Sequence, residues 1–93
     1  MSTPTVANNP GNSRYEISVD GKLAGFTEYV DTGDILVFPH TVVLDEFEGQ
    51  GLGAILVTGA LGDVRANGRL IRVECPYIRR FLRKHPEYRD LLA

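Results

Sequence analysis

Three glycines alternate with other residues in the segment 48–54 (EGQGLGA). From Gly51 onward the apolar residues recur with a helical period, so the glycines stand where a loop turns into a helix. Glycine in a helix costs up to about 1 kcal/mol relative to alanine, and the first amide groups of a helix are unpaired and attract anions. The segment therefore predicts either a phosphate site on bare backbone amides or a tight loop packed against a neighbouring strand.

Other phosphate-binding patterns fit this segment less well. Gly49-x-Gly51-x-x-Ala54 matches the dinucleotide pattern G-x-G-x-x-G/A, with Glu74 in the place of the ribose-binding acid. That pattern follows a buried strand almost directly, whereas the segment 45–48 (DEFE), with three acidic residues, intervenes here. One βαβ unit also supplies only half of a dinucleotide site, and no Gly-Lys-Ser/Thr follows that would make a Walker A loop. A nucleotide-binding fragment is the weakest of the interpretations.

Hydrophobic periodicity predicts the order β-β-β-β-α-β-α, an antiparallel meander that runs into one βαβ crossover. Asp20-Gly21 follows an alternating strand and favours a type I′ hairpin turn. The predicted strands are 15–19, 22–30, 35–38, 41–44 and 70–73, and the helices are 51–68, 76–84 and a short 87–92. The expected buried faces are Leu52, Ile55, Leu56, Gly59, Ala60 and Val64 on the first helix, and Tyr77, Ile78, Phe81 and Leu82 on the second.

Length and composition limit what the chain can be. Ninety-three residues suit one domain, and residues 1–13 (MSTPTVANNPGNS) are too polar to order themselves, so we expect a flexible leader there. No apolar run approaches the roughly 20 residues of a membrane span. One cysteine excludes an intramolecular disulfide and a multi-cysteine zinc site, and a net charge of −2 gives no general reason to bind nucleic acid. We therefore expect a cytoplasmic protein without metal, membrane or nucleic-acid partner.

The two parts of the sequence differ in net charge, although the whole chain carries only −2. Residues 1–64 hold nine acidic and two basic residues, a net charge of −7. Residues 65–93 hold eight basic and three acidic residues, a net charge of +5. The halves are either two solvated faces, or a basic surface for an anionic ligand beside an acidic approach for a cationic one.

Three passages together resemble the acyl-CoA-binding core of the GNAT acetyltransferase superfamily, and in particular its small single-domain branch. They are 20–26 (DGKLAGF), 38–41 (FPHT) leading to 47–53 (FEGQGLG), and 73–78 (VECPYI) with 85–88 (HPEY). The resemblance spans about Tyr15 to Leu92. It implies a minimal GNAT-like α/β (α+β) fold, with residues 14–93 as a single N-acetyltransferase domain.

The resemblance also implies a ligand and the residues that hold it. The pantetheine of acetyl-CoA would lie between two parallel strands that splay apart, here 41–44 and 70–73, with its pyrophosphate on the first helix. Glu48 stands where the family usually has Arg or Gln, which puts one side-chain contact to phosphate in doubt, and the basic helix 79–84 can compensate. The implied cofactor-binding residues are Val43, Leu44, Glu48, Gly49, Gln50, Gly51, Leu52, Gly53, Ala54, Cys75, Tyr77 and Arg80.

Cys75 and His40 are the candidate catalytic residues. Cys75 precedes Pro76, so its thiol is expected at a helix N-cap, where the helix dipole stabilises thiolate. It is either the nucleophile or a small residue lining the channel. His40 is the candidate base, while His85 reads as a helix-end residue. In direct transfer, His40, Glu74 or a water would deprotonate the amine.

The resemblance thus implies an N-acetyltransferase that uses acetyl-CoA and acts on an amine or protein acceptor whose identity the sequence leaves open. The alternative is a CoA-binding sensor or interaction module without turnover, because the chain lacks the N-terminal helices with which larger relatives build an acceptor site. A monomer or weak homodimer is expected.

Overall fold

The computed structural model describes residues 3–93, which form a mixed α/β fold. The elements in chain order are β1 (Thr5–Asn9), η1 (Pro10–Asn12), β2 (Arg14–Val19), β3 (Lys22–Glu28), β4 (Val30–Asp31), β5 (Ile35–Phe38), β6 (Thr41–Val43), η2 (Asp45–Phe47), α1 (Leu52–Ala66), β7 (Leu70–Val73), α2 (Pro76–Lys84) and η3 (Pro86–Leu91). The predicted order of strands and helices is confirmed from residue 14 onward, with the return strand divided into β3 and β4.

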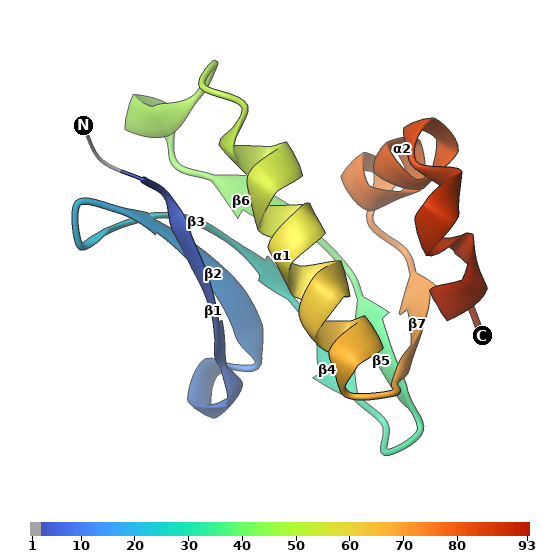
Figure 1. Ribbon diagram of the computed structural model, residues 1–93. Coiled ribbons are helices and arrows are strands. Elements are labelled where there is room, and N and C mark those ends of the chain that lie inside the picture. The colour runs from blue at the N-terminus through green and yellow to red at the C-terminus, as the bar shows by residue number, and fades with distance from the viewer. Residues whose placement is uncertain (1–2) are drawn as a thin grey trace.

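The strands form two sheets, the four-stranded one to the left of α1 and the three-stranded one toward its lower right (Figure 1). One sheet has the antiparallel order β1-β2-β3-β6, and the other has the order β4-β5-β7. Within the second sheet β5 and β7 are parallel, with Ile35 opposite Leu70 and Phe38 opposite Val73. Because α1 lies between these two strands in the chain, it is the crossover helix that the sequence predicted.

Turn residues set the ends of the central elements. Asp20 and Gly21 both have positive φ, 54° and 76°, as the predicted type I′ turn between β2 and β3 requires. At the C-terminal end of α1, Gly68 has a φ of 65° and follows the last turn of the helix. The amide of Asn67 and its side chain both donate to the carbonyl oxygen of Asp63, so the helix ends where the Asn-Gly pair predicted.

The expected flexible leader is wrong for residues 5–12, because residues 5–9 form β1 and pair with residues 14–18 of β2, and residues 10–12 form η1. The physical reason is close packing by Val6. A Cβ built on Gly59 of α1 would lie 2.8 Å from the Val6 side chain, so the missing Cβ lets this strand approach the helix. The side chain of Asn9 also donates to Glu16 at 3.1 Å. Residues 1 and 2 of the expected leader lie outside the described residues.

The core lies between α1 and the sheets, and the predicted apolar face of α1 is correct except at one position. Leu52, Leu56, Ala60 and Val64 are buried as predicted, but Ile55 is 42% exposed. Val57 and Leu61 are buried in addition. The helix is covered along a broader stripe because β1, which the sequence analysis did not expect, packs on it.

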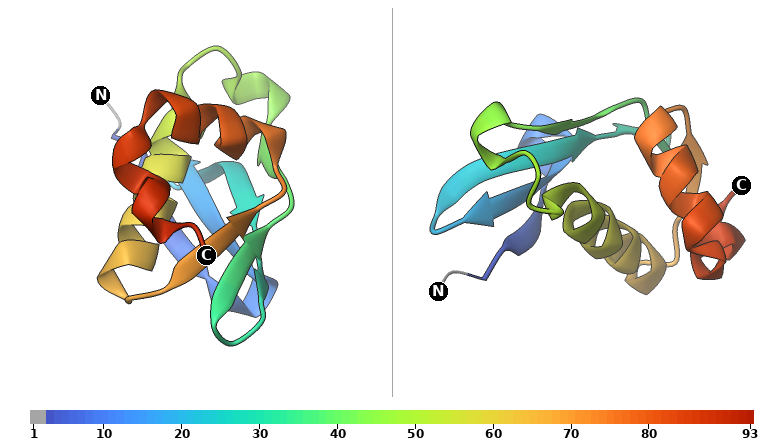
Figure 2. Two further views of the ribbon diagram at one scale, coloured as in Figure 1. Left: turned by 90° about the vertical axis from the view of Figure 1, so that its right-hand side faces the viewer. Right: turned by 90° about the horizontal axis from the view of Figure 1, so that it is seen from above.

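The second helix stands apart from the four-stranded sheet. Seen from above, α2 and that sheet lie on opposite sides of the molecule, with α1 between them (Figure 2). Ile78, Phe81 and Leu82 are buried as predicted and Tyr77 is partly buried, which leaves the basic residues of α2 outside. No helix within residues 3–93 is long and apolar enough to cross a bilayer.

Candidate functional site

The two sheets separate at Pro39-His40, and this break organises the candidate site. Before the break, β5 pairs with β7, and the carbonyl oxygen of Phe38 accepts the amides of Glu74 at 3.0 Å and Cys75 at 3.1 Å. After the break, the chain pairs with β3 instead. The strands at 41–44 and 70–73 therefore belong to different sheets and diverge from one another. The parallel neighbour of β7 is β5.

Val43 and Leu44, two of the predicted binding residues, are held by β3. Val43 lies opposite Gly25, and the amide of Leu44 donates to the carbonyl of Ala24 at 2.8 Å. A Cβ on Gly25 would lie 2.5 Å from the carbonyl oxygen of Val42, so only glycine allows this approach. The resulting position of β6 turns it away from β7.

The N-terminus of α1 follows an exposed loop and has no side-chain cap among the described residues. Gly49 and Gly51 have φ of 80° and 73°, a left-handed conformation that other residues rarely adopt. Gly51 is the N-cap, and no side chain of the described residues caps the helix. The first amides of α1 therefore carry the partial positive charge of the helix without an internal partner from a side chain. The predicted loop residues Glu48, Gly49, Gln50, Gly51 and Ala54 are exposed around this end, and Leu52 and Gly53 are buried.

Gly53 has a different role from the other two glycines. A Cβ at this position would lie 2.6 Å from the hydroxyl and 2.9 Å from Cζ of Tyr77. The absent side chain thus lets α2 pack its tyrosine against the first turn of α1, so the packing interpretation holds for Gly53. Burial raises the pKa of the Tyr77 hydroxyl above its usual value, and the charge of Arg80 offsets only part of this rise.

A basic cavity of about 270 Å³ lies between the two helices. It is lined by Ala54, Tyr77, Arg80, Phe81, Lys84 and His85. The predicted residues Ala54, Tyr77 and Arg80 are thus brought together. Sequence analysis missed Lys84 and His85 as lining residues, although Lys84 follows Arg80 at the four-residue spacing that places two side chains on one helix face. His85 stacks on Phe81 with 4.3 Å between ring centroids, a role consistent with its expected place at the helix end.

Cys75 is the N-cap of α2, with Pro76 in the first helical turn as predicted. The side chain is buried, 2% exposed. Its Sγ lies 3.4 Å from Oγ1 of Thr41 and donates to it. This contact joins the start of α2 to β6 across the divergence, and sequence analysis did not find Thr41. A threonine in a short strand carries no distinguishing pattern.

His40 contacts a different partner from Cys75. Its Nε2 lies 2.6 Å from Oε1 of Glu28, and its side chain is 55% exposed. Within residues 3–93, no hydrogen bond joins His40 to Cys75. The two candidate catalytic residues are therefore not assembled as a nucleophile and its base. Glu74, the third candidate, lies exposed at the end of β7 and its amide bonds to Phe38.

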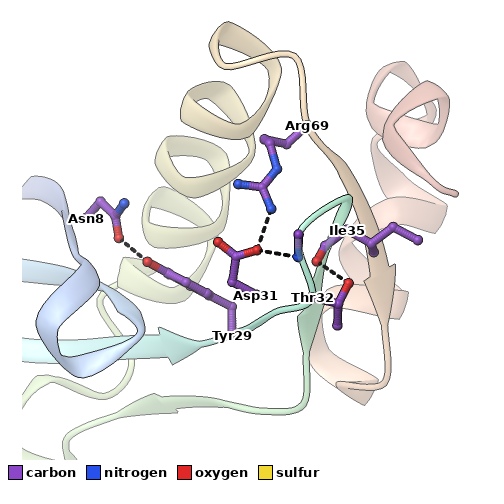
Figure 3. Close-up of polar contacts among 7 residues, drawn as sticks. Asn8, Tyr29, Asp31, Thr32, Ile35 and Arg69 are labelled. Carbon is purple, nitrogen blue, oxygen red and sulfur yellow. Dashed lines mark hydrogen bonds and ion pairs between the residues drawn. The ribbon is translucent and has the colours of Figure 1, made fainter.

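A larger cavity, of about 420 Å³, lies at the other end of α1 and has a different character. Three polar pairs line it. Arg69 contacts Asp31 at 2.7 Å, and the Tyr29 hydroxyl donates to Asn8 at 2.8 Å (Figure 3). The Tyr15 hydroxyl donates to Asp63 at 2.7 Å. It is far from the glycine loop because its α1 residues are at the C-terminal end of the helix. In the part of the chain that the structure describes, no three His, Cys, Asp or Glu residues form a metal site.

Comparisons with known proteins agree with this geometry. A model of the family described as GCN5-related N-acetyl-transferase matches residues 14–91. No curated protein matches the chain significantly. The solution structure of a candidate GCN5-like N-acetyltransferase from Staphylococcus aureus superposes with a TM-score of 0.72 at 23% identity, covering 100% of this chain and 91% of that one. A ribosomal-protein-alanine N-acetyltransferase from Brucella melitensis biovar Abortus 2308 superposes with a TM-score of 0.58 at 21% identity, covering 86% of this chain and 60% of that one.

Proposed function

The chain belongs to the GCN5-related N-acetyltransferase family, and we propose that it binds acetyl-CoA or a close acyl-CoA and transfers the acyl group to an amine. The observation that carries the proposal is the uncapped N-terminus of α1 beside the basic cavity of Arg80 and Lys84. Ala54 of the first turn of α1 lines this cavity together with the two cationic side chains, and phosphates bind both to helix N-termini and to cationic side chains.

The phosphate end of the ligand would be held by α1 and α2 together. The amides of the first turn of α1 donate to the pyrophosphate, and the helix dipole adds attraction for its charge. Arg80 and Lys84 supply two positive charges from the same cavity. Glu48 takes the place of the Arg or Gln that the family usually has, so these two side chains replace the contact that the loop lacks.

The reactive end would lie where β6 and β7 diverge. When bound, acetyl-CoA supplies an acyl group activated as a thioester. Cys75 lies at this divergence with its thiol held by Thr41. Cys75 is the N-cap of α2, so its sulfur is placed to take the acyl group before the amine does.

The amine would be deprotonated by His40. Its contact with the Glu28 carboxylate fixes the orientation of the ring, and the other nitrogen, Nδ1, remains available for the amine proton. The acidic residues of the first 64 positions favour the approach of a cationic amine. Direct transfer uses His40 alone, whereas transfer through Cys75 uses both residues in succession.

A CoA-binding module without turnover is the second candidate. One observation favours it: Cys75 hydrogen-bonds to Thr41 and His40 to Glu28, so neither residue activates the other. Acyl transfer to a panel of amines in a single turnover separates the two candidates. An acylated amine supports the enzyme, and tight binding without acylation of any amine supports the module.

Binding itself is tested by calorimetry with acetyl-CoA and acetyl-dephospho-CoA. Replacing Arg80 with Gln removes one charge-assisted contact, and because this side chain is exposed we expect an affinity loss of about fivefold rather than the larger loss of a buried pair. Lys84→Gln is expected to act in the same way. If only acetyl-CoA is sensitive to these changes, the two residues hold the 3′-phosphate; if both ligands are sensitive, they hold the pyrophosphate.

The matched control is Arg83→Gln. Arg83 belongs to the same helix but lines a different cavity, together with Arg79 and Arg89. The substitution removes the same charge from the protein. An equal loss of affinity in Arg80→Gln and Arg83→Gln would mean that only the overall charge of α2 matters, and would contradict a site between α1 and α2.

A further inference from the structure

One polar residue lies in the fully buried core of residues 3–93, and it is Thr27 of β3, with 0% exposure. Its Oγ1 lies 3.0 Å from Oγ1 of Thr41, which is directly opposite on β6. Thr41 in turn accepts the thiol of Cys75. The three side chains thus form a continuous chain of hydrogen bonds from the interior of the four-stranded sheet to the N-cap residue of α2.

Packing alone does not require this chain. Valine has nearly the shape of threonine, and burying a hydroxyl is unfavourable unless it is hydrogen-bonded. A Val-Val pair at these two positions would fill the same space between β3 and β6 and would be favoured in a sheet. The hydroxyl pair is therefore better explained by the one polar group that it reaches at the divergence of β6 and β7, the thiol of Cys75.

We propose that Thr41, supported by Thr27, is a positioning residue that holds the sulfur of Cys75 at the divergence of β6 and β7 in both the thiol and the thiolate form. The inference rests on the proposed role of Cys75 in acyl transfer. It gives Thr27 and Thr41 a role in acyl transfer although neither one touches the acyl group.

The two hydroxyl groups suit this role because either one can donate to the other. When the sulfur carries its proton, it donates to Thr41, whose own hydrogen then turns toward Thr27. When the sulfur is a thiolate, the Thr41 hydrogen turns toward the sulfur, and the Thr27 hydroxyl donates to Thr41. Only two hydroxyl rotations separate the two arrangements, and no heavy atom has to move.

Acyl transfer through Cys75 uses both hydrogen-bond arrangements, because the sulfur loses its proton in the first transfer and regains a proton in the second. The S–C bond of the CoA thioester breaks as a new S–C bond forms at Cys75, and the proton lost by the Cys75 thiol ends on the CoA thiol. When the acyl group passes to an amine, the S–C bond at Cys75 breaks, a C–N bond forms, and Cys75 recovers a proton from the amine. The Thr41 hydroxyl accepts a hydrogen bond from the thiol and donates one to the thiolate.

The test is the rate of alkylation of Cys75 by iodoacetamide as a function of pH, in the protein without ligand. Thr41→Val removes the hydroxyl with little change of shape. Loss of a hydrogen bond to the thiolate moves the pH of half-maximal rate upward by about one unit, so the rate at a pH below both midpoints falls about tenfold. Thr41→Ser keeps a hydroxyl and is expected to restore the original midpoint.

The midpoint separates positioning from packing. A change that alters only the access of the reagent to the thiol multiplies the rate at every pH by one factor and leaves the midpoint unchanged. Thr58→Val removes an exposed hydroxyl of α1 that has no hydrogen bond to Cys75, and it serves as the control. An unchanged midpoint in folded Thr41→Val, or equal shifts in Thr41→Val and Thr58→Val, would overturn the proposal.

Thr27→Val tests the second member of the chain. Without the Thr27 donor, Thr41 loses its support, so we expect a smaller upward shift of the midpoint than in Thr41→Val. A shift as large as that of Thr41→Val, or none at all, overturns the role of Thr27. Because none of these measurements uses CoA, they fail independently of the calorimetry, and a protein that binds no acetyl-CoA can still show the shift.

Discussion

Replacing Gly51 with alanine tests the conformation of the loop without introducing a clash. Gly51 has a φ of 73°, and a Cβ built there meets no atom within 4 Å. The only cost is therefore the left-handed backbone conformation. Gly62, inside α1, also has free space around its missing Cβ but ordinary helical geometry, so Gly62→Ala is a matched control with the same chemical change.

The expected effects have opposite signs. The left-handed conformation costs an alanine about 1–2 kcal/mol, and the lower entropy of the unfolded chain returns about 0.4–1 kcal/mol, which leaves a net loss of about 1 kcal/mol for Gly51→Ala. In the interior of α1, alanine is better than glycine by about 0.5–1 kcal/mol. The two variants should therefore differ by about 1.5–2 kcal/mol in free energy of unfolding.

Urea unfolding followed by far-ultraviolet circular dichroism measures this difference, and calorimetry with acetyl-CoA measures the effect on the site. Because Gly51 is the N-cap of α1, its replacement should weaken binding, whereas Gly62→Ala should leave the affinity unchanged. If Gly51→Ala is as stable as Gly62→Ala, the loop does not need a left-handed residue at this position. In that case the geometry assigned to the phosphate site is wrong.

Three further predictions address the rest of the fold. Burial and a hydrogen bond to the Asp63 carboxylate raise the pKa of Tyr15, so above pH 10 the unfolded chain loses the phenol proton before the folded chain does. The free energy of unfolding therefore falls with rising pH, by up to about 1.4 kcal/mol per pH unit. Urea unfolding between pH 9 and 11 should show a weaker fall in Tyr15→Phe. A hydrogen bond from Arg69 lowers the pKa of Asp31, so the stability advantage of the wild type over Asp31→Asn should be present above the ordinary pKa of 3.8 and should disappear in more acidic urea titrations. Gly59→Ala places a Cβ 2.8 Å from Val6 and should cost about 1–3 kcal/mol, and an undiminished cost in the double variant with Val6→Ala would contradict packing of β1 as the cause.

The sequence was sufficient wherever local chemistry decides the structure. The Asp20-Gly21 turn, the N-cap position of Cys75 and the end of α1 near Asn67 all follow from the conformations that these residues adopt, and the structure agrees with each. The predicted loop 48–54 also begins α1 as expected.

The sequence was insufficient where a distant contact decides. β1 is polar and short, and it is ordered because Gly59 leaves room for Val6, two residues that are more than fifty positions apart. The added strand widens the sheet that covers α1, so Val57 and Leu61 are buried beyond the predicted face. Thr27 and Thr41 were missed because a hydroxyl in a strand has no periodicity of its own.

The break at Pro39-His40 has a consequence for how this protein can vary. The run from β5 through β6 is the central strand of the three-stranded sheet before the break and an edge strand of the four-stranded sheet after it. A one-residue insertion or deletion there reverses the direction of every later side chain in the strand, so that Thr41 would exchange places with a neighbour and face away from Cys75. We therefore expect natural variants to change the identity of residues in this segment while keeping its length constant.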